Sequence, residues 1–338
     1  VSCAKKQNEQ GEAQRQKVHL EVGHLSATGH TKYFIAKEAG FFDEEGLDVN
    51  LVEFANSADG ISAIRSGNLD IGSFSTTAPL LHIAKGADLH ILGGVMGEDA
   101  AIVVAKDSPI ASVADLKGKK IATVRLATGD AVLRGALTRA GIDFKKDVAI
   151  SELKSPPAVL EAVKAGEVDA GVTWGPHDQR TDEYGLKIIA RSKTLWPGHP
   201  CCRLVSLGET LEKQEKVAPD VWVRFLRAFL KAEKFARDNH EKTIEYLAKY
   251  VPLNPDLLDR AYYGGFLDQS TDPNVDGVVE FYKIMRESGQ IEDEPTVPED
   301  IHPFINTQYY AQALESLATE QPAEPFWQEL QKVFEERN

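Results

Sequence analysis

Residues 18–52 read VHLEVGHLSATGHTKYFIAKEAGFFDEEGLDVNLV, and this stretch decides the fold. Apolar residues alternate with other residues at 18–22, as they do in a strand with one buried face. A loop of small and polar residues follows at 26–30, and apolar residues then recur at helical spacing over 33–39. A second alternating segment occupies 47–52. The stretch therefore predicts a strand, a loop, a helix and a second strand, which is the unit of a parallel sheet.

Two later segments share one pattern. Residues 64–71 read IRSGNLDI and residues 163–170 read VKAGEVDA, so each places a helix end at a glycine and leads through an acidic residue into a short strand. The repeated pattern indicates two α/β lobes of similar construction. The further strands expected in these lobes are 69–74, 120–124, 148–153 and 170–174.

The domain organisation follows from length and from a change in pattern. A chain of 338 residues exceeds what one hydrophobic core usually organises, so two lobes are expected. After residue 207 the pattern becomes helical, with long helices predicted at 220–239 and 241–250. We therefore predict a tether at 1–17, a first lobe formed by 18–107 and 208–338 with a helical C-terminal cover, and a second lobe at 108–207.

Charge and hydropathy exclude some classes of partner. Asp and Glu number 52 against 38 Lys and Arg, so the formal net charge is -14. Such a balance repels phosphate backbones and argues against a nucleic acid partner. No uninterrupted apolar run approaches the roughly 20 residues of a transmembrane helix.

The amino terminus has a pattern of its own. The chain opens Val1-Ser2-Cys3-Ala4, and a polar tract without apolar periodicity follows at 5–12. Small residues before a cysteine that precedes a polar tether resemble the trimmed lipobox of bacterial lipoproteins. Cys3 is therefore the predicted site of lipidation, which would anchor the protein without a spanning helix. The alternative is an incidental free thiol.

Three stretches carry a resemblance to a known family: 33–49 (YFIAKEAGFFDEEGLDV), 64–72 (IRSGNLDIG) and 115–122 (DLKGKKIA). With them the chain resembles the periplasmic substrate-binding proteins of ABC importers, in the nitrate/taurine/sulfonate group that includes the thiamine-precursor-binding NMT1/THI5-like proteins. The first stretch is the most specific. The order and spacing of the pattern fit from about residue 18 to residue 250.

The resemblance implies a fold and a function. The fold is the two-lobe type II fold of periplasmic binding proteins, α/β, with parallel-type sheets and flanking helices, and one small molecule closed between the lobes. The implied partners are that solute and the membrane permease and ATPase of an ABC importer. The implied location is the periplasm or the outer face of the cytoplasmic membrane, and we expect a monomer without a cofactor.

Four loops qualify as the solute site, because ligands of open parallel sheets lie beyond the carboxyl ends of the strands. They are 26–30, 74–77, 126–130 and 173–176. Hydroxyls and free backbone amides at helix starts bind anionic or strongly polar groups, although a single Ser or Thr is equally explained by helix capping. The candidate residues in these loops are Ser26, Thr28, His30, Phe74, Ser75, Thr76, Thr77, Thr128, Gly129 and Trp174.

Two side chains in these loops keep two interpretations each, and two nearby arginines are candidate cations. His30 could donate to a solute or fill a structural role, and Trp174 could stack on a planar solute or pack in the core. Arg125 and Arg203 are the cations that would favour an anionic group. We accordingly expect a small anionic or planar organic solute: a sulfonate, an oxyanion, a carboxylate or a pyrimidine-like molecule.

The segment from His199 to Arg203 contains the other two cysteines, Cys201 and Cys202. The thiamine-precursor binders of the group carry a longer cysteine run at a comparable place, and this chain has only two of those cysteines. The thiols could pack near a crossing between the lobes or touch the solute. No second Cys/His cluster completes a zinc site, so no metal is expected.

We therefore predict a binding protein and not an enzyme. The sequence has no Gly-x-Ser-x-Gly, His-Glu-x-x-His or phosphate-loop pattern. The alternative is an enzyme similar to the thiamine-pyrimidine synthases of the same superfamily. Such an enzyme would use cleft residues, for example Cys201 or Cys202 with His30 or His177.

Overall fold

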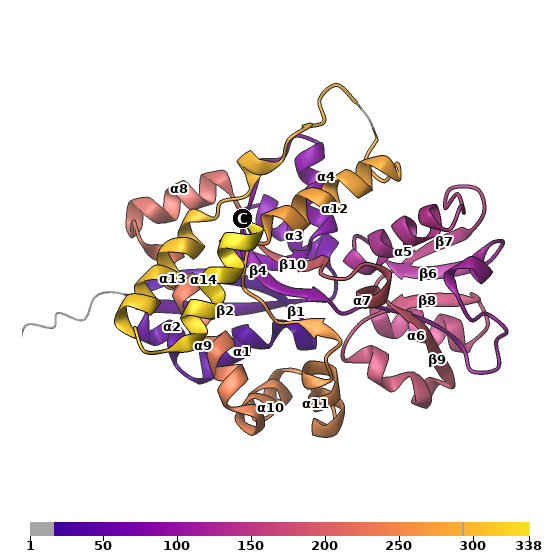
Figure 1. Ribbon diagram of the computed structural model, residues 1–338, viewed down its shortest axis with the longest axis horizontal. Helices are drawn as coiled ribbons and strands as arrows, with labels where there is room; N and C mark the ends of the chain where they lie inside the picture. Colours follow the sequence, from indigo (N-terminus) through magenta and orange to yellow (C-terminus); the bar gives the residue numbers. More distant parts are fainter. Residues whose placement is uncertain (1–16, 293) are drawn as a thin grey trace, which may run out of the picture.

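The computed structural model describes residues 17–292 and 294–338. Two mixed sheets with flanking helices form two lobes, and the second lobe lies on the right in Figure 1. The two-lobe α/β fold predicted from the sequence is confirmed. Cys3 and nearly all of the predicted tether lie outside the described residues.

The first lobe is built on a six-stranded sheet of order β11-β4-β10-β3-β1-β2. The predicted unit forms one side of this sheet, since β1 pairs in parallel with both β2, which is the edge strand, and β3. β10 runs antiparallel to its neighbours β3 and β4. The strands are β1 Val18–Leu25, β2 Leu47–Phe54, β3 Ile71–Ser75, β4 Leu89–Glu98, β10 Pro200–Leu207 and β11 Leu267–Asp268.

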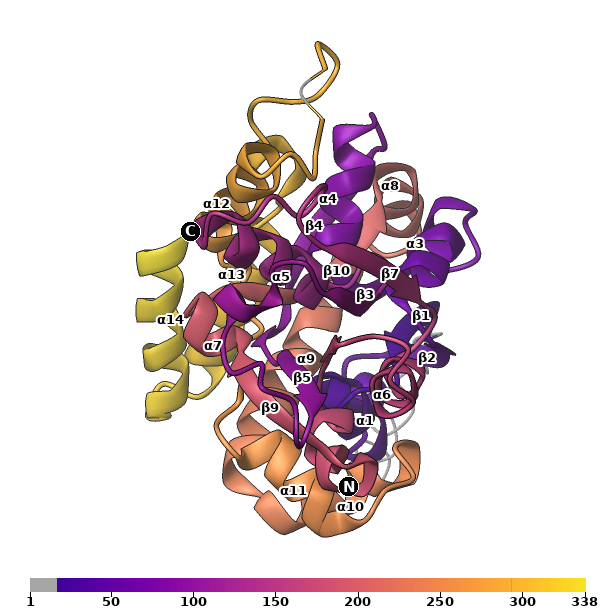
Figure 2. The same ribbon diagram turned by 90° about the vertical axis from the view of Figure 1, so that its right-hand side faces the viewer.

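The second lobe is built on a five-stranded sheet of order β7-β6-β8-β5-β9. β6 is parallel to β7 and β8, whereas β5 is antiparallel to β8 and β9. The strands are β5 Ala101–Ala105, β6 Lys120–Val124, β7 Ala149–Leu153, β8 Ala170–Thr173 and β9 Leu186–Arg191. Figure 2 turns this lobe toward the viewer.

The chain passes between the sheets at residues 99–100 and again at residues 192–199. The lobe boundaries predicted near residues 107 and 207 each lie about eight residues beyond these crossings. Only two residues separate β4 from β5. The polar segment 107–109, which follows β5, therefore comes after a strand that already belongs to the second sheet. By sheet membership, the second lobe begins at β5 and ends at β9.

The helices flank the sheets and are short in the α/β parts. In the first lobe they are α1 Thr31–Glu38, α2 Phe41–Glu44, α3 Ser57–Arg65 and α4 Thr77–Ala84. In the second lobe they are α5 Thr128–Arg139 and α6 Pro156–Lys164, and α7 Ser192–Leu195 lies on the return crossing. The 3-10 helices are η1 Thr28–His30, η2 Val113–Leu116, η3 His177–Tyr184 and η4 His302–Phe304.

The C-terminal helices cover the first lobe, as predicted. α9 packs against α1 and α2, where the Phe229 ring meets the Tyr33 ring edge to face at 4.6 Å. The buried carboxylate of Glu45 pairs with Arg227 at 2.9 Å and with Lys231 at 2.6 Å. The helices are α8 Gly208–Val217, α9 Val221–Asp238, α10 His240–Tyr250, α11 Pro255–Tyr263, α12 Val275–Glu287, α13 Gln308–Glu320 and α14 Pro325–Arg337.

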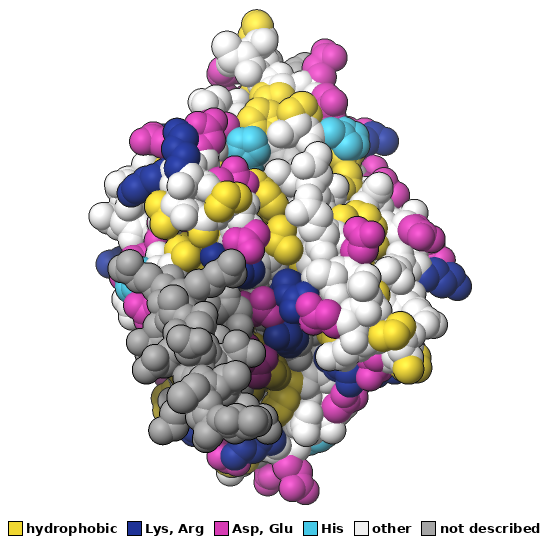
Figure 3. All heavy atoms as spheres, turned by 90° about the vertical axis from the view of Figure 1, so that its left-hand side faces the viewer, with side chains coloured by type: hydrophobic (Ala, Val, Ile, Leu, Met, Phe, Trp, Pro, Cys, Tyr) yellow, Lys and Arg dark blue, Asp and Glu magenta, His cyan; other side chains and the backbone are white. Residues whose placement is uncertain are grey.

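The cover also reaches the second lobe. The Arg191 guanidinium lies over the Phe266 ring, 3.8 Å from its centroid, and the Gln290 amide donates to the Ala131 carbonyl at 3.4 Å. The C-terminal region therefore bridges the lobes. At the opposite end of the molecule, the surface of the first lobe carries interspersed charges of both signs (Figure 3).

Candidate functional site

The predicted loops meet where the two lobes face each other. They line a small, partly open cavity of about 30 Å³. Met96 and Asp99, which the sequence analysis did not single out, also line this cavity. The predicted site residues that line it are His30, Ser75, Thr128, Gly129, Trp174, Cys201 and Cys202.

Several of the predicted hydroxyls connect the lobes directly. Thr128 of the second lobe donates to the Cys201 carbonyl at 2.7 Å and accepts from the Thr76 amide at 3.1 Å. The Ser75 hydroxyl donates to the Leu126 carbonyl. The Thr77 hydroxyl donates to the Ala127 carbonyl at 3.5 Å. In this closed arrangement the hydroxyls at the helix starts bind the backbone of the opposite lobe.

Simple helix capping accounts for one of these residues. The Ser75 hydroxyl accepts from the Ala78 amide at 3.2 Å at the start of α4. The Thr128 hydroxyl caps nothing in α5, because both of its partners lie in the first lobe. Ser26 is half-buried and does not line the cavity. Thr28 is fully buried, and its hydroxyl has no partner.

His30 presents one defined nitrogen. The Leu25 amide, which can only donate, approaches Nδ1 at 3.2 Å, so Nδ1 accepts and the neutral ring carries its proton on Nε2. The Ser73 hydroxyl lies 3.0 Å from the same Nδ1. Burial lowers the pKa of His30 well below its usual value, which keeps the ring neutral. Nε2 has no partner, and His30 lines the cavity, so the ring is a donor for a bound molecule.

Asp99 is the residue that sequence reasoning missed. It lies at the first crossing between the lobes, only 3% exposed, with φ at 66°. One carboxylate oxygen accepts from the Gly175 amide at 3.3 Å and the other has no partner. Burial and the nearby Asp178 raise the pKa of Asp99 well above its usual value. The available signal was an acidic pair, residues 98 and 99, between two apolar runs.

The two cysteines lie on β10 with their sulfur atoms 3.9 Å apart. The hydrogen bond with Cys201 and burial raise the pKa of the Cys202 thiol well above its usual value. Among the described residues, neither thiol has a histidine as its hydrogen-bond partner. Cys201 contributes mainly its backbone carbonyl to the contact between the lobes.

The predicted cations lie elsewhere. Arg125 is exposed, and it does not line the cavity. Arg203 is buried, but its guanidinium donates to the carbonyls of Met96 at 2.7 Å and of Asp272 and Pro273 at 3.1 Å each, which ties β10 to the C-terminal region. Phe74 is a core residue.

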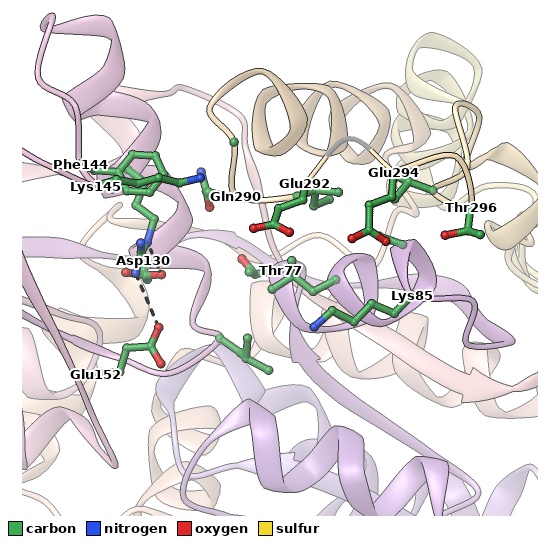
Figure 4. Close-up of a pocket in the computed structure, with 17 residues that line it drawn as sticks. Thr77, Lys85, Asp130, Phe144, Lys145, Glu152, Gln290, Glu292, Glu294 and Thr296 are labelled. Carbon is green, nitrogen blue, oxygen red and sulfur yellow. Dashed lines mark hydrogen bonds and ion pairs between the residues drawn. The ribbon is translucent and has the colours of Figure 1, made fainter.

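A larger hollow of about 640 Å³ lies beside the cavity, between α4, the start of α5 and the C-terminal region (Figure 4). It gathers charges of both signs, and Arg134 pairs with Asp130 at 2.9 Å and with Glu152 at 3.6 Å. Lys85 and Lys145 also line it. Lys85, Arg134 and Lys145 therefore line this outer hollow and not the smaller cavity.

The described residues show neither a membrane-spanning helix nor a cluster of metal ligands. Residues 17–292 and 294–338 contain no helix with the length and apolarity required to cross a bilayer. The part of the chain that the structure describes also holds no group of three or more His, Cys, Asp or Glu side chains placed to hold a metal ion.

Related sequences agree with this architecture. A protein of Brucella abortus named as a binding protein is 28% identical over 247 residues, which are 72% of this chain and 74% of that protein. A protein of Escherichia coli named for binding aliphatic sulfonates is 35% identical over 208 residues, 61% of this chain and 63% of that protein. A 4-amino-5-hydroxymethyl-2-methylpyrimidine phosphate synthase of Legionella pneumophila is 23% identical over 226 residues, 66% of this chain and 70% of the enzyme.

Solved structures and a family comparison give the same result. The periplasmic nitrate-binding protein NrtA of Synechocystis has a TM-score of 0.76 at 16% identity, over 91% of this chain and 90% of that chain. The alkanesulfonate-binding protein SsuA of Xanthomonas axonopodis has a TM-score of 0.73 at 21% identity, over 86% and 99%. The family described as NMT1-like matches residues 13–251. The predicted resemblance is thus confirmed, and the chain belongs to the NMT1-like family.

Proposed function

We propose that this chain is the solute-binding component of an ABC importer and that it holds one small solute in the cleft between its lobes. The observation that carries the proposal is the inter-lobe cavity, into which buried polar groups without partners project from both the first lobe and the crossing. These groups are the His30 Nε2 donor and one oxygen of Asp99. Buried polar groups are normally satisfied, so their occurrence together favours a bound molecule.

Solute entry requires the lobes to separate. Pockets for small organic molecules usually measure about 300–1,000 Å³, far more than the cavity between the closed lobes. Opening would break the hydrogen bonds of Thr128 with Cys201 and Thr76, and closure on a solute would use binding energy to rebuild the inter-lobe contact. The two crossings are the hinge of this movement.

The partners and the location follow from the same proposal. The importer would supply a membrane permease and an ATPase, and the protein would work in the periplasm or at the outer face of the cytoplasmic membrane. Lipid attached to Cys3 would hold it there. Relatives named for binding sulfonates and solved structures of periplasmic binding proteins support this assignment.

We propose binding and not catalysis. The Legionella relative is the argument for an enzyme. Against it, a thiol nucleophile needs a base that removes its proton, and among the described residues neither thiol has a histidine as its hydrogen-bond partner. The hydrogen bond between the thiols lowers the pKa of Cys201 and raises the pKa of Cys202, so their contact is with each other and not with a general base.

Native mass spectrometry of the protein purified without added solute tests the proposal. We expect one small molecule per chain, and we expect the identified molecule to raise the melting temperature, because it binds only the folded form. The matched control is protein purified by unfolding, dialysis and refolding, which should lack the extra mass. If neither a bound molecule nor a stabilising member of a broad solute library is found, the proposal fails.

A further inference from the structure

The carboxylate of Asp99 is held in the cleft by a costly backbone conformation. Asp99 and its neighbour Glu98 have φ of 66° and 62°, in the left-handed region that residues with a Cβ atom rarely adopt. Glu98 has partners, since it accepts from the Gly198 amide at 3.0 Å and pairs with Lys193 at 3.2 Å. Asp99 receives a single protein hydrogen bond, from Gly175. The crossing thus directs an incompletely satisfied carboxylate toward the cavity.

The cation whose charge acts on Asp99 is already committed to other groups. It is Arg191, whose guanidinium is engaged with Asp178 at 2.6 Å and stacked over Phe266. None of the described residues that line the cavity is Lys or Arg. The acidic groups near the cavity therefore exceed the basic ones, and a bound anion would meet an unfavourable field there.

Two backbone amides of the facing loops are also engaged. The Thr76 amide donates to the Cys201 carbonyl at 2.6 Å, and the Thr28 amide donates to the Gly175 carbonyl at 3.4 Å. Among the buried side-chain atoms of the described residues that line the cavity, those without a partner are one donor, His30 Nε2, and one acceptor oxygen of Asp99. This set matches a molecule that carries its own N–H group and an acceptor atom, and it is poor for an oxyanion.

We propose that Asp99 is a solute-contacting residue that selects molecules carrying an N–H donor, such as an amine, an amidine or an amino-substituted aromatic ring, over oxyanions. This inference rests on the proposed function and narrows its solute class. The donor of the solute would bond to the free oxygen of Asp99, His30 would donate to an acceptor atom of the solute, and the Trp174 side chain, which lines the same cavity, would border an aromatic ring.

A two-class solute panel tests the inference on the wild-type protein. One class contains benzamidine, benzylamine, 2-aminopyridine and 4-aminopyrimidine; the other contains nitrate, ethanesulfonate, benzoate and benzenesulfonate. Isothermal titration calorimetry at pH 7.5 should find binding in the first class and at least tenfold weaker or no binding in the second. An oxyanion that binds as tightly as the best N–H solute overturns the inference and leaves the proposed function intact. If no panel member binds, the inference fails; the proposed function fails only if, in addition, the native protein carries no solute and no member of the broad solute library stabilises it.

Substitutions provide the second readout. Asp99→Asn should weaken binding of the best N–H solute at least tenfold, because the amide nitrogen that replaces one oxygen cannot accept a hydrogen bond from the solute. Asp130→Asn is the matched control, since Asp130 is also a buried carboxylate but pairs with Arg134 outside the cavity. Equal affinities for Asp99→Asn and the wild type would contradict the inference. The panel on the wild type gives an answer even where the variant does not fold.

Discussion

The hydroxyl of Thr128 in the second lobe donates a 2.7 Å hydrogen bond to the carbonyl of Cys201 in the first. The Thr76 amide donates to the same hydroxyl at 3.1 Å, so one side chain joins the lobes through two bonds. The helix start that the sequence marks as a solute contact is thus part of the closing contact.

We expect Thr128→Val to weaken solute binding about tenfold, because the closed form loses both bonds of the hydroxyl while the open form loses none. Small-angle X-ray scattering should show a larger radius of gyration than the wild type. Thr138→Val is the control, since this exposed hydroxyl bonds only within α5. Unchanged affinity and unchanged scattering for Thr128→Val would contradict the closing role.

Gly175→Ala should also oppose closure. A Cβ atom at this position would lie 2.7 Å from the Thr28 hydroxyl and 3.0 Å from an Asp99 oxygen, both too close. We expect at least a tenfold loss of affinity with little change in the isolated fold of either lobe. Gly135→Ala is the matched change, because its Cβ would meet Ile284 at 3.4 Å and Arg139 at 3.6 Å, which are ordinary contact distances. Isothermal titration calorimetry measures the solute affinity of both variants. Equal affinities would contradict the predicted clash of a Cβ atom at position 175.

The pH dependence of stability should report Asp99. Its pKa is raised in the folded protein, chiefly by burial, so the folded state binds more protons than the unfolded state above the unfolded pKa of about 3.9. Its contribution is therefore fully present at low pH and is lost as pH rises through the folded pKa. The charged or titratable groups facing it are Asp178, Arg191 and Cys201.

Asp99→Asn removes the titrating group and with it this loss of stability as pH rises. We expect the variant to exceed the wild type in free energy of unfolding by about 1–3 kcal/mol at pH 7.5, the usual cost of a buried polar group without its partner. The difference should shrink below pH 4. Urea unfolding at a series of pH values measures both, and a variant that is less stable at every pH would rule out a destabilising carboxylate.

The cysteine side chains should matter less for binding than Thr128. Cys201→Ala keeps the carbonyl that accepts from Thr128, so we expect less than a threefold change in affinity. Cys202→Ala should cost about 1–2 kcal/mol of stability through lost packing, because Cys202 is 5% exposed within the core. If a cysteine variant loses binding while Thr128→Val keeps it, the thiols carry recognition instead.

Lipidation at Cys3 stays a prediction that lies outside the described residues. Precursor expressed in a bacterium with its secretion signal should carry lipid on Cys3, and Cys3→Ser should move the protein from the membrane fraction to the soluble fraction. Mass spectrometry of the amino-terminal peptide measures the modification. An unmodified Cys3 in the native host would refute the anchor.

The sequence by itself predicts the parallel part of each sheet and the loops that face the cleft. Strand alternation and helical spacing are local properties, so β1, β2, β6 and β8 can be read from a few neighbouring residues each. The loop 126–130 that contains Thr128 is predicted for the same reason, although α5 already begins at Thr128. The predicted lobe boundary lies after β5, because the apolar pattern of a strand does not reveal which of two sheets the strand joins.

The tertiary structure decided which of the predicted polar groups face a solute. Thr128 meets Cys201 across 73 residues of chain and Thr76 across 52, and only the relative position of the lobes determines whether its hydroxyl binds backbone or solute. The same holds for Asp99, whose importance comes from burial and from the commitment of Arg191 to Asp178. Local patterns determine secondary structure, whereas hydrogen-bond partners at a lobe interface depend on contacts that are distant in the chain.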